Sequence, residues 1–360
     1  MILAIETSCD DSAVALLNMN GDVITNEISS QIDLHKKYGG IVPEIASRKH
    51  LTSLPLILRH TFQKYSIQLN ELNGIAVTYS PGLIGSLLVG VNYAKTLAWI
   101  AGCPLFPIDH LEGHLLAPFL DEKDLSFPYL ALIASGGHTH IIHAKALGDY
   151  QLLGRTMDDA AGEAYDKVAK MLGFQYPGGP IIEKIAENFP EPDIVFPIPL
   201  KGKKILDFSF SGLKTAVRNE SIKRNVYTDT EQLISYSDFE QMNDLNRKNE
   251  IGNIAASFQR IMCQIFERRM KEAINRTRCK KMTISGGVAA NKGIRKTLTE
   301  LAKKRGIGFY YPSIINCTDN AAMIGHTALQ YYNAGNRGID EPLTLNASSK
   351  SPLGQLQVTV

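Results

Sequence analysis

Two segments of the chain share one plan: a short apolar strand, a turn of small and polar residues, and a second apolar strand. Residues 2–17 read ILAIETSCDDSAVALL, and residues 129–144 read YLALIASGGHTHIIHA. Each pattern predicts a β-hairpin whose tip exposes backbone N–H groups and hydroxyls. A matched pair in the two halves of one chain indicates an internal duplication, with one copy in each of two domains.

Strands and helices alternate after the first hairpin, which predicts an α/β domain. Residues 43–64 have the apolar spacing of a helix, with Ile45, Leu51, Leu54 and Leu58 on its core face, and Pro55 is expected to kink or split it. A short strand at 75–78, an apolar helix after Pro81-Gly82 and a strand at 103–108 complete the alternation.

The second half is expected to hold a helix over 158–173 that stops at Gly173, a helix over 254–275 and a strand over 282–285. The polar stretch 219–251 lacks a clear core face and is interpreted as a surface insertion. A chain of 360 residues exceeds the usual size of one core. We therefore expect domains at 1–115, with a helical insertion near 35–65, and at 116–320, a helix near 320–335 that packs back on the first, and a tail at 336–360.

Neither a secretory signal nor a membrane span is predicted. Glu6 interrupts the apolar start, and runs such as 87–89 are short. A disulfide framework and a thiolate zinc site are unlikely for the five cysteines, which lie far apart without a C-x-x-C pair: Cys9, Cys103, Cys263, Cys279 and Cys317. These features are typical of a cytoplasmic protein.

The net charge of +2 hides an asymmetry along the chain. Residues 260–310 contain fourteen Lys and Arg against three acids, so this segment carries +11 and the remainder −9. Such a segment would attract a polyanion, or it is simply a solvated helix face.

The sequence His110-Leu111-Glu112-Gly113-His114 holds the sharpest local signal. Histidines at i and i+4 share one face of a helix, where both imidazoles can reach one metal ion, although this spacing also arises by chance. The zinc-protease signature H-E-x-x-H places the acid directly after the first histidine. Glu112 stands two positions along, which argues against a protease.

A further carboxylate ligand is expected from elsewhere in the chain, and Asp319 is the candidate. It follows a loop and precedes the small-residue helix AAMIGHTAL. Spacing alone favours the other interpretation, in which Asp319 merely caps that helix. Two histidines and one carboxylate with open positions suit iron or zinc.

Glycine turns occur at Ser135-Gly136-Gly137, at Ser285-Gly286-Gly287 and at 177–180. Glycines allow close approach of backbone to a phosphate, and a helix N-terminus favours its charge, but most such glycines are structural. A P-loop and a full G-x-G-x-x-G are absent from the sequence.

The first hairpin also carries Asp10 and Asp11, which could position a magnesium-bound phosphate or a substrate hydroxyl, or could serve turn chemistry. Asp166 lies on the helix after the second hairpin, where most aspartates are solvated.

Taken together, nine segments resemble the TsaD family of bacterial tRNA N6-adenosine threonylcarbamoyltransferases, from residue 2 to about 333. They are ETSCDDS (6–12), HKKYGGIVPEIASRKH (35–50), HLEGH (110–114), SGGHT (135–139), GEAYDK (162–167), YPGGP (176–180), FSFSGLKT (208–215), SGGVAANK (285–292) and CTDNAAMIG (317–325).

The resemblance implies an α/β, two-domain ATPase fold like that of actin, Hsp70 and the sugar kinases, with duplicated domains and a cleft between them. It implies one divalent metal, Fe²⁺ or alternatively Zn²⁺, on His110, His114 and Asp319. Threonylcarbamoyl-AMP, or ATP or ADP, would bind at Ile133, Ala134, Ser135, Gly136, Gly137, Asp166, Gly179 and Asn291. The implied partners are tRNA, TsaB through the helical region after residue 35, TsaE, and TsaC as supplier of the adenylate.

Three positions depart from the family pattern. Asp11 stands where many members have Glu, Ala134 replaces a larger apolar residue, and Glu183 stands where Asp is common, so Glu183 is left out of the site. The 219–251 stretch is also longer than in typical members of the family.

The implied reaction transfers the threonylcarbamoyl group from the adenylate to N6 of adenosine-37, in tRNAs that read codons beginning with adenine, and releases AMP. Asp10, Asp11 and His138 are candidates for the general base. A sugar or acetate kinase on the same fold would have no use for the two histidines. A chaperone-like ATPase would leave the basic segment unexplained, and a zinc protease is disfavoured by Glu112.

Overall fold

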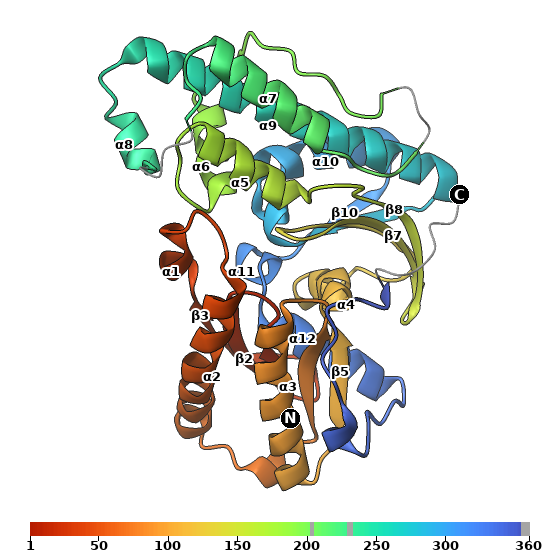
Figure 1. Cartoon of the computed structure of the whole chain (residues 1–360). Coiled ribbons are helices and arrows are strands. Elements are labelled where there is room, and N and C mark those ends of the chain that lie inside the picture. The colour runs from red at the N-terminus through yellow and green to blue at the C-terminus, as the bar shows by residue number, and fades with distance from the viewer. Residues whose placement is uncertain (202–204, 229–232, 354–360) are drawn as a thin grey trace.

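The computed structural model describes residues 1–201, 205–228 and 233–353. It contains two five-stranded sheets, each with its own helices, which form two lobes (Figure 1). The first lobe holds β1 (Ile2–Glu6), β2 (Asp11–Leu17), β3 (Val23–Ser30), β4 (Gly74–Ser80) and β5 (Leu105–Asp109). The second lobe holds β6 (Tyr129–Ala134), β7 (Thr139–Ala146), β8 (Asp149–Arg155), β9 (Lys281–Ser285) and β10 (Gly308–Tyr310).

The two sheets have the same topology. The strand order is β3-β2-β1-β4-β5 in one and β8-β7-β6-β9-β10 in the other. In each, the first three strands of the lobe pair antiparallel and the last two join in parallel. The duplication predicted from the two hairpins, β1–β2 and β6–β7, is therefore confirmed.

Helices cover both faces of the first sheet. Along β1, Leu3 and Ile5 pack in the core beneath α2 (Pro43–Tyr65) and α3 (Ile84–Ala101), and the alternate residues Ile2 and Ala4 pack with α12 (Ala321–Asn333). This alternation follows from the period of two along a strand. The short helix α1 (Ile32–Lys36) precedes α2.

Pro55 does not split α2, which is continuous from Pro43 to Tyr65. Proline removes the hydrogen bond to the carbonyl of the residue four positions earlier, Leu51. Leu51 is 56% exposed and not buried as predicted, so its carbonyl lies on the solvent side of the helix. Leu54 and Leu58 are buried and hold the helix on the sheet.

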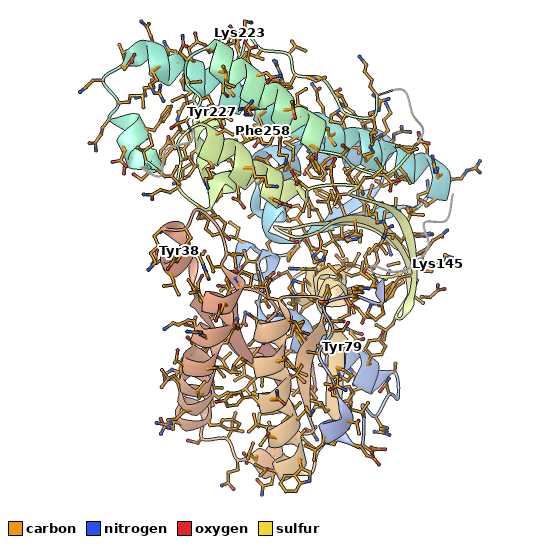
Figure 2. The ribbon with its side chains drawn as sticks, viewed as in Figure 1. Tyr38, Tyr79, Lys145, Lys223, Tyr227 and Phe258 are labelled. Carbon is orange, nitrogen blue, oxygen red and sulfur yellow. The ribbon has the colours of Figure 1, made fainter. Side chains whose placement is uncertain are left out.

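The second lobe has its largest core on one face of its sheet. That core contains α5 (Ala161–Met171), α6 (Gly178–Glu187), α7 (Ser211–Lys223), α9 (Leu245–Thr277) and α10 (Lys292–Arg305). Phe258 on α9 is fully buried and meets Tyr165 edge-on, with ring centroids 5.1 Å apart (Figure 2). Helix α5 ends at Met171, and Gly173 follows with φ +90°.

The 219–251 stretch is more deeply packed than expected. It includes the end of α7, the helix α8 (Tyr236–Glu240) and the first turns of α9, which begins at Leu245 and not near 254. Val226, Phe239 and Ile251 are buried in the core of the second lobe. These apolar residues are widely spaced in the sequence, so they gave no periodic signal. Residues 229–232 lie outside the described residues.

Among the described residues, helix α3 is long and apolar enough to cross a membrane, by length and composition only. In the structure it packs against α2 and β4, and a third of it is buried. Its buried side chains, among them Val91 and Ala94, belong to the core of the first lobe, whereas Ile84, Leu88, Trp99 and Ile100 are exposed.

Two elements lie where the lobes meet, α4 (His110–Leu116) and α11 (Ile314–Cys317) (Figure 1). Beyond α12, the described part of the tail returns to the first sheet, where Ile339 bridges to Leu105 and the Ser351 hydroxyl donates to Asp109 at 2.5 Å.

Candidate metal centre and nucleotide site

Helix α4 joins the first sheet to the second and has a contact in each direction. Asp109, the last residue of β5, caps it by accepting the N–H groups of Leu111 at 2.8 Å and Glu112 at 3.3 Å. Leu111 packs in the core beneath the second sheet. Gly113 faces α12, where an added Cβ would lie 2.8 Å from Ile324. The glycine therefore allows α4 and α12 to approach closely.

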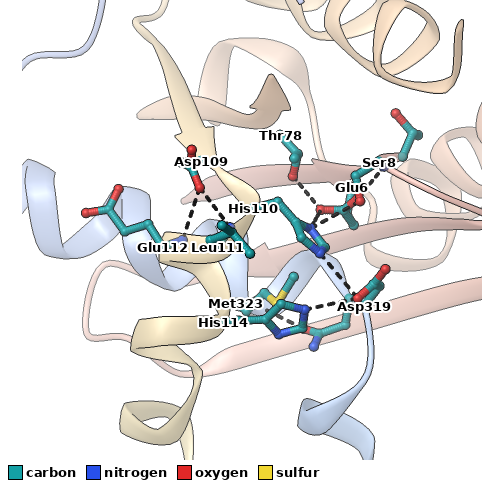
Figure 3. A network of polar contacts seen from close by, with 12 residues as sticks. Glu6, Ser8, Thr78, Asp109, His110, Leu111, Glu112, His114, Asp319 and Met323 are labelled. Carbon is teal, nitrogen blue, oxygen red and sulfur yellow. Dashed lines mark hydrogen bonds and ion pairs between the residues drawn. The ribbon is translucent and has the colours of Figure 1, made fainter. Parts of the chain in front are cut away.

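Both histidines of α4 point their Nε2 atoms at one carboxylate oxygen (Figure 3). Asp319 Oδ1 lies 3.4 Å from Nε2 of His110 and 3.1 Å from Nε2 of His114. Ligand atoms that each lie about 2.0–2.2 Å from one ion are themselves separated by about 3.0–3.4 Å. One ligand atom from each of the three residues lies within 4.8 Å of the others, so the set fits a metal ion.

A buried acid that the sequence interpretation missed, Glu6, orients His110 from behind. His110 Nδ1 lies 3.1 Å from Glu6 Oε2 and 3.1 Å from the Ser8 hydroxyl oxygen. Thr78 donates its hydroxyl to the same Glu6 oxygen at 2.5 Å. A ligating histidine typically gives its other ring nitrogen to such a carboxylate, which fixes the ring and raises its basicity.

Together, the charge and hydrogen bonds near Glu6 affect its pKa more than burial does. Burial alone would raise the pKa of Glu6, but the charge of His110 and the hydrogen bond to it lower that pKa below its usual value. The sequence feature that could have predicted a role for Glu6 is its position at the end of an otherwise apolar strand, ILAIE, where a buried acid needs a partner.

Glu6→Gln should weaken metal binding by about 10–100-fold, the usual effect of losing a carboxylate behind a ligating histidine. Titration with Co²⁺, followed by its visible absorption, measures the affinity. Glu27→Gln is the matched control. Glu27 is a partly exposed acid on β3 that pairs with Lys64 of α2. Equal affinities for the two variants would contradict a role for Glu6 at the metal.

The two Ser-Gly-Gly turns lie side by side. They follow the neighbouring parallel strands β6 and β9, where Ile133 is the register partner of Ser285. Gly286 has φ +88°, and a Cβ there would contact the backbone of Ala134. At Gly136, Gly137 and Gly287, by contrast, an added Cβ would meet nothing within 4 Å. These three glycines therefore face open space, as a phosphate-binding turn must.

The other predicted substrate residues lie around these turns. Ile133 and Ala134 are buried in β6. Asn291 caps α10 and forms a reciprocal amide pair with Gln259, with N···O distances of 2.9 and 3.1 Å. Asp166 on α5 accepts the Gly178 N–H at 2.8 Å, beside Gly179, and burial raises the pKa of Asp166 to about 6.

The three candidate bases are not part of the ligand cluster, which consists of His110, His114 and Asp319. Burial raises the pKa of Asp10, and it raises that of Asp11 to about 7. Burial lowers the pKa of His138 to about 3, with the nearby His110 adding to the effect. His138 closes the glycine turn by accepting the Ser135 N–H at 2.8 Å through its carbonyl.

Glu112 projects away from the two histidines of its own helix (Figure 3). Its Oε1 accepts hydrogen bonds from Tyr150 at 2.8 Å and Tyr331 at 2.6 Å. A metalloprotease of the H-E-x-x-H type needs its glutamate beside the metal as the general base. Glu112 is turned away from the histidines, so the site does not have the geometry of such a protease.

Comparison with solved structures identifies the fold. The chain aligns with full-length HypF in its phosphate- and nucleotide-bound form at a TM-score of 0.58, with 13% identity, over 93% of this chain and 56% of that one. Component A of (R)-2-hydroxyglutaryl-CoA dehydratase from Acidaminococcus fermentans aligns at a TM-score of 0.52, with 14% identity, over 93% of this chain and 98% of that one. The predicted ATPase-like α/β fold with duplicated domains is confirmed.

Comparison with protein families and curated sequences gives closer relatives. Residues 22–326 match the family described as TsaD, tRNA N6-adenosine threonylcarbamoyltransferase. Relatives named tRNA N6-adenosine threonylcarbamoyltransferase occur in Clostridioides difficile (strain 630), at 43% identity over 98% of both chains, and in Desulfitobacterium hafniense (strain Y51), at 45% over 92% of both. With a histidine pair and an aspartate converging beside two glycine turns, and with this similarity along nearly its whole length, the chain belongs to the TsaD family.

Proposed function

We propose that this protein transfers the threonylcarbamoyl group from threonylcarbamoyl-AMP to N6 of adenosine-37 in tRNAs that read codons beginning with adenine. The observation that carries the proposal is the convergence of two imidazole Nε2 atoms on Asp319, at the junction with the lobe that holds the glycine turns. A bound metal and a bound nucleotide could then act on one acyl group.

His110, His114 and Asp319 would hold the metal, for which we propose Fe²⁺, since two histidines and one carboxylate with open positions suit that ion. When bound, the ion supplies Lewis-acid polarisation of an acyl oxygen. Glu6 keeps the His110 ring turned so that Nε2, and not Nδ1, faces Asp319.

The glycine turns would bind the adenylate, or ATP or ADP. Gly136 and Gly137 would offer backbone N–H groups just beyond the end of β6, and Ser135 would offer its hydroxyl, because its own N–H donates to the His138 carbonyl. Ile133 and Ala134 lie buried beside them. Asp166, Gly179 and Asn291 would contact the nucleoside. Holding both reactants in one geometry lowers the entropic cost of the reaction.

In the reaction, the N6 lone pair of adenosine forms a C–N bond to the carbamoyl carbon. The bond from that carbon to the phosphate oxygen breaks, AMP leaves with the electron pair, and N6 loses one proton. Asp10, Asp11 or His138 would accept that proton. Asp11 is the best matched of the three, because its pKa of about 7 lies near the operating pH of most enzymes.

The basic segment 260–310 would contact the tRNA backbone. Lys303, Lys304 and Arg305 are exposed at the end of α10, next to the exposed Lys280. Gly308, just beyond α10, donates its N–H to the Lys280 carbonyl at 2.9 Å, so the two stretches are adjacent. Clustered exposed cations bind phosphates with little dependence on sequence.

Reversing the charge of Lys303, Lys304 and Arg305 together should weaken tRNA binding by at least about 10-fold near 0.1 M salt and reduce the salt slope by about 2–3. Filter binding across a salt series measures both. Reversal of Lys64, Lys145 and Lys223, exposed lysines on other elements, is the control for total charge (Lys145 and Lys223 are marked in Figure 2). Equal losses for the two triple variants would argue against a local contact.

We propose TsaB as the partner of the helical region after residue 35. Exposed apolar side chains on α2 and α3 support this surface, among them Leu51, Leu56, Ile84 and Leu88. TsaE would complete the assembly and TsaC would supply the adenylate, all in the cytoplasm.

Reconstitution tests the proposal as a whole. Incubating tRNA with this chain, TsaB, TsaE, TsaC, threonine, bicarbonate and ATP should yield the modified nucleoside in the digested tRNA. The same mixture without this chain should yield none, and an equal yield in the two mixtures would refute the assignment.

A further inference from the structure

The glutamate of the HLEGH segment has no part in the chemistry above, yet it is among the most enclosed acids of the protein. Glu112 is 8% exposed and lies between the two ligand histidines on a helix of only seven residues. Both tyrosine hydroxyls donate to the same oxygen, Oε1, at 2.8 Å from Tyr150 and 2.6 Å from Tyr331.

The two tyrosines come from different lobes. Tyr150 lies on β8, the edge strand of the second sheet, and packs against the core that includes Leu111 and Leu115 of α4. Tyr331 lies near the end of α12 and packs against the core beneath the first sheet. The β7–β8 turn approaches Tyr331 directly, since a Cβ on Gly148 would lie 3.4 Å from its hydroxyl. Glu112 thus joins the helix of the metal ligands to both lobes at one oxygen atom.

We propose that Glu112 is a positioning residue that, with Tyr150 and Tyr331, forms a latch between the lobes and fixes the rotation of α4. The latch rests on the proposed metal role of His110, His114 and Asp319. Rotation of α4 about its axis would swing both imidazoles away from Asp319. Anchoring it to α12 holds the histidines near Asp319, which directly precedes that helix. Anchoring it to β8 sets the spacing between the metal triad and the glycine turns of the second lobe.

The test compares two substitutions at Glu112. Glu112→Leu keeps the bulk and removes the acceptor. It should lower Co²⁺ affinity by about 10–100-fold, as loss of a group that orients metal ligands does, and should speed amide hydrogen exchange across residues 110–116. Glu112→Gln keeps an Oε1 that can accept both hydroxyls, so it should restore both readouts to within about 3-fold of wild type. A charge effect would not be rescued by Gln, and failure of that rescue would overturn the positioning role.

Tyr150→Phe combined with Tyr331→Phe removes only the two hydroxyls, and it decides the matter if Glu112→Leu does not fold. This double variant should reproduce the loss of Co²⁺ affinity and the faster exchange in 110–116. Tyr236→Phe, which removes a hydroxyl bonded to Asn188 within the second lobe, is the matched control.

Wild-type affinity and exchange in the double variant would overturn the latch. A wild-type chain that binds no Co²⁺ would instead count against the proposed metal, while exchange in 110–116 would still decide the latch. Neither readout requires tRNA, TsaB or the adenylate.

Discussion

His110→Ala is expected to abolish metal binding and threonylcarbamoyl transfer together. His110 supplies one of three ligand atoms, and its Nε2 is 3.4 Å from Asp319 Oδ1. Two remaining ligands from one histidine and one carboxylate would hold an ion weakly. The substitution also leaves Glu6 buried without its ring partner. The rate of transfer should fall by about 10³-fold. This is the large end of the range measured when one group that stabilises a developing oxyanion is removed.

Metal content after purification and single-turnover transfer from threonylcarbamoyl-AMP to tRNA measure the two effects. His60→Ala, at an exposed position on α2, is the control and should change neither. Transfer that persists in a metal-free His110→Ala variant would defeat the Lewis-acid role while leaving the fold and family intact.

Gly136→Leu is expected to abolish nucleotide binding without unfolding the protein. An added Cβ at Gly136 meets nothing within 4 Å, and its φ is not in the left-handed region, so the backbone tolerates a side chain. That side chain would occupy the space in front of the turn where a phosphate must approach the N–H groups. We expect at least about a 100-fold loss of affinity for ADP, equivalent to roughly 2.7 kcal/mol.

Gly286→Ala is the contrasting variant on the adjacent turn. Its φ of +88° and the nearby Ala134 carbonyl leave no room for a methyl group. The free energy of unfolding should therefore drop by about 1–3 kcal/mol from strain alone. Calorimetric titration with ADP and thermal unfolding separate the two outcomes. A Gly136→Leu protein that binds ADP normally would remove the first Ser-Gly-Gly turn from the nucleotide site.

The features predicted well from the sequence were those set by neighbouring residues. The two hairpins have short apolar strands and small-residue turns, so their duplication appeared in the sequence and then in the matching strand orders of the sheets. Pro55 misled the interpretation because its local cost is outweighed by the packing of Leu54 and Leu58 on the first sheet. The 219–251 stretch misled it because Val226, Phe239 and Ile251 are buried singly, without a period.

The candidate site shows the same division. The spacing of His110 and His114 placed both rings on one helical face, and HLEGH also excluded a protease correctly by the position of its acid. Spacing alone favoured Asp319 as a cap, and the family resemblance changed that interpretation. The structure gives the capping role to Asn320, whose side chain accepts the Met323 N–H at 3.0 Å, and turns Asp319 to the histidines.

By itself, the sequence determined the duplicated α/β architecture, the helical histidine pair and the glycine turns, because each depends on residues within a few positions of one another. Only the tertiary structure decided which distant groups complete them. Asp319 reaches His114 across 205 positions, Glu6 reaches His110 across 104, and Tyr331 reaches Glu112 across 219. The contacts of Asp319 and Tyr331 follow from the packing of α12 against both α4 and the first sheet, at a distance that Gly113 permits, and no local pattern encodes that arrangement.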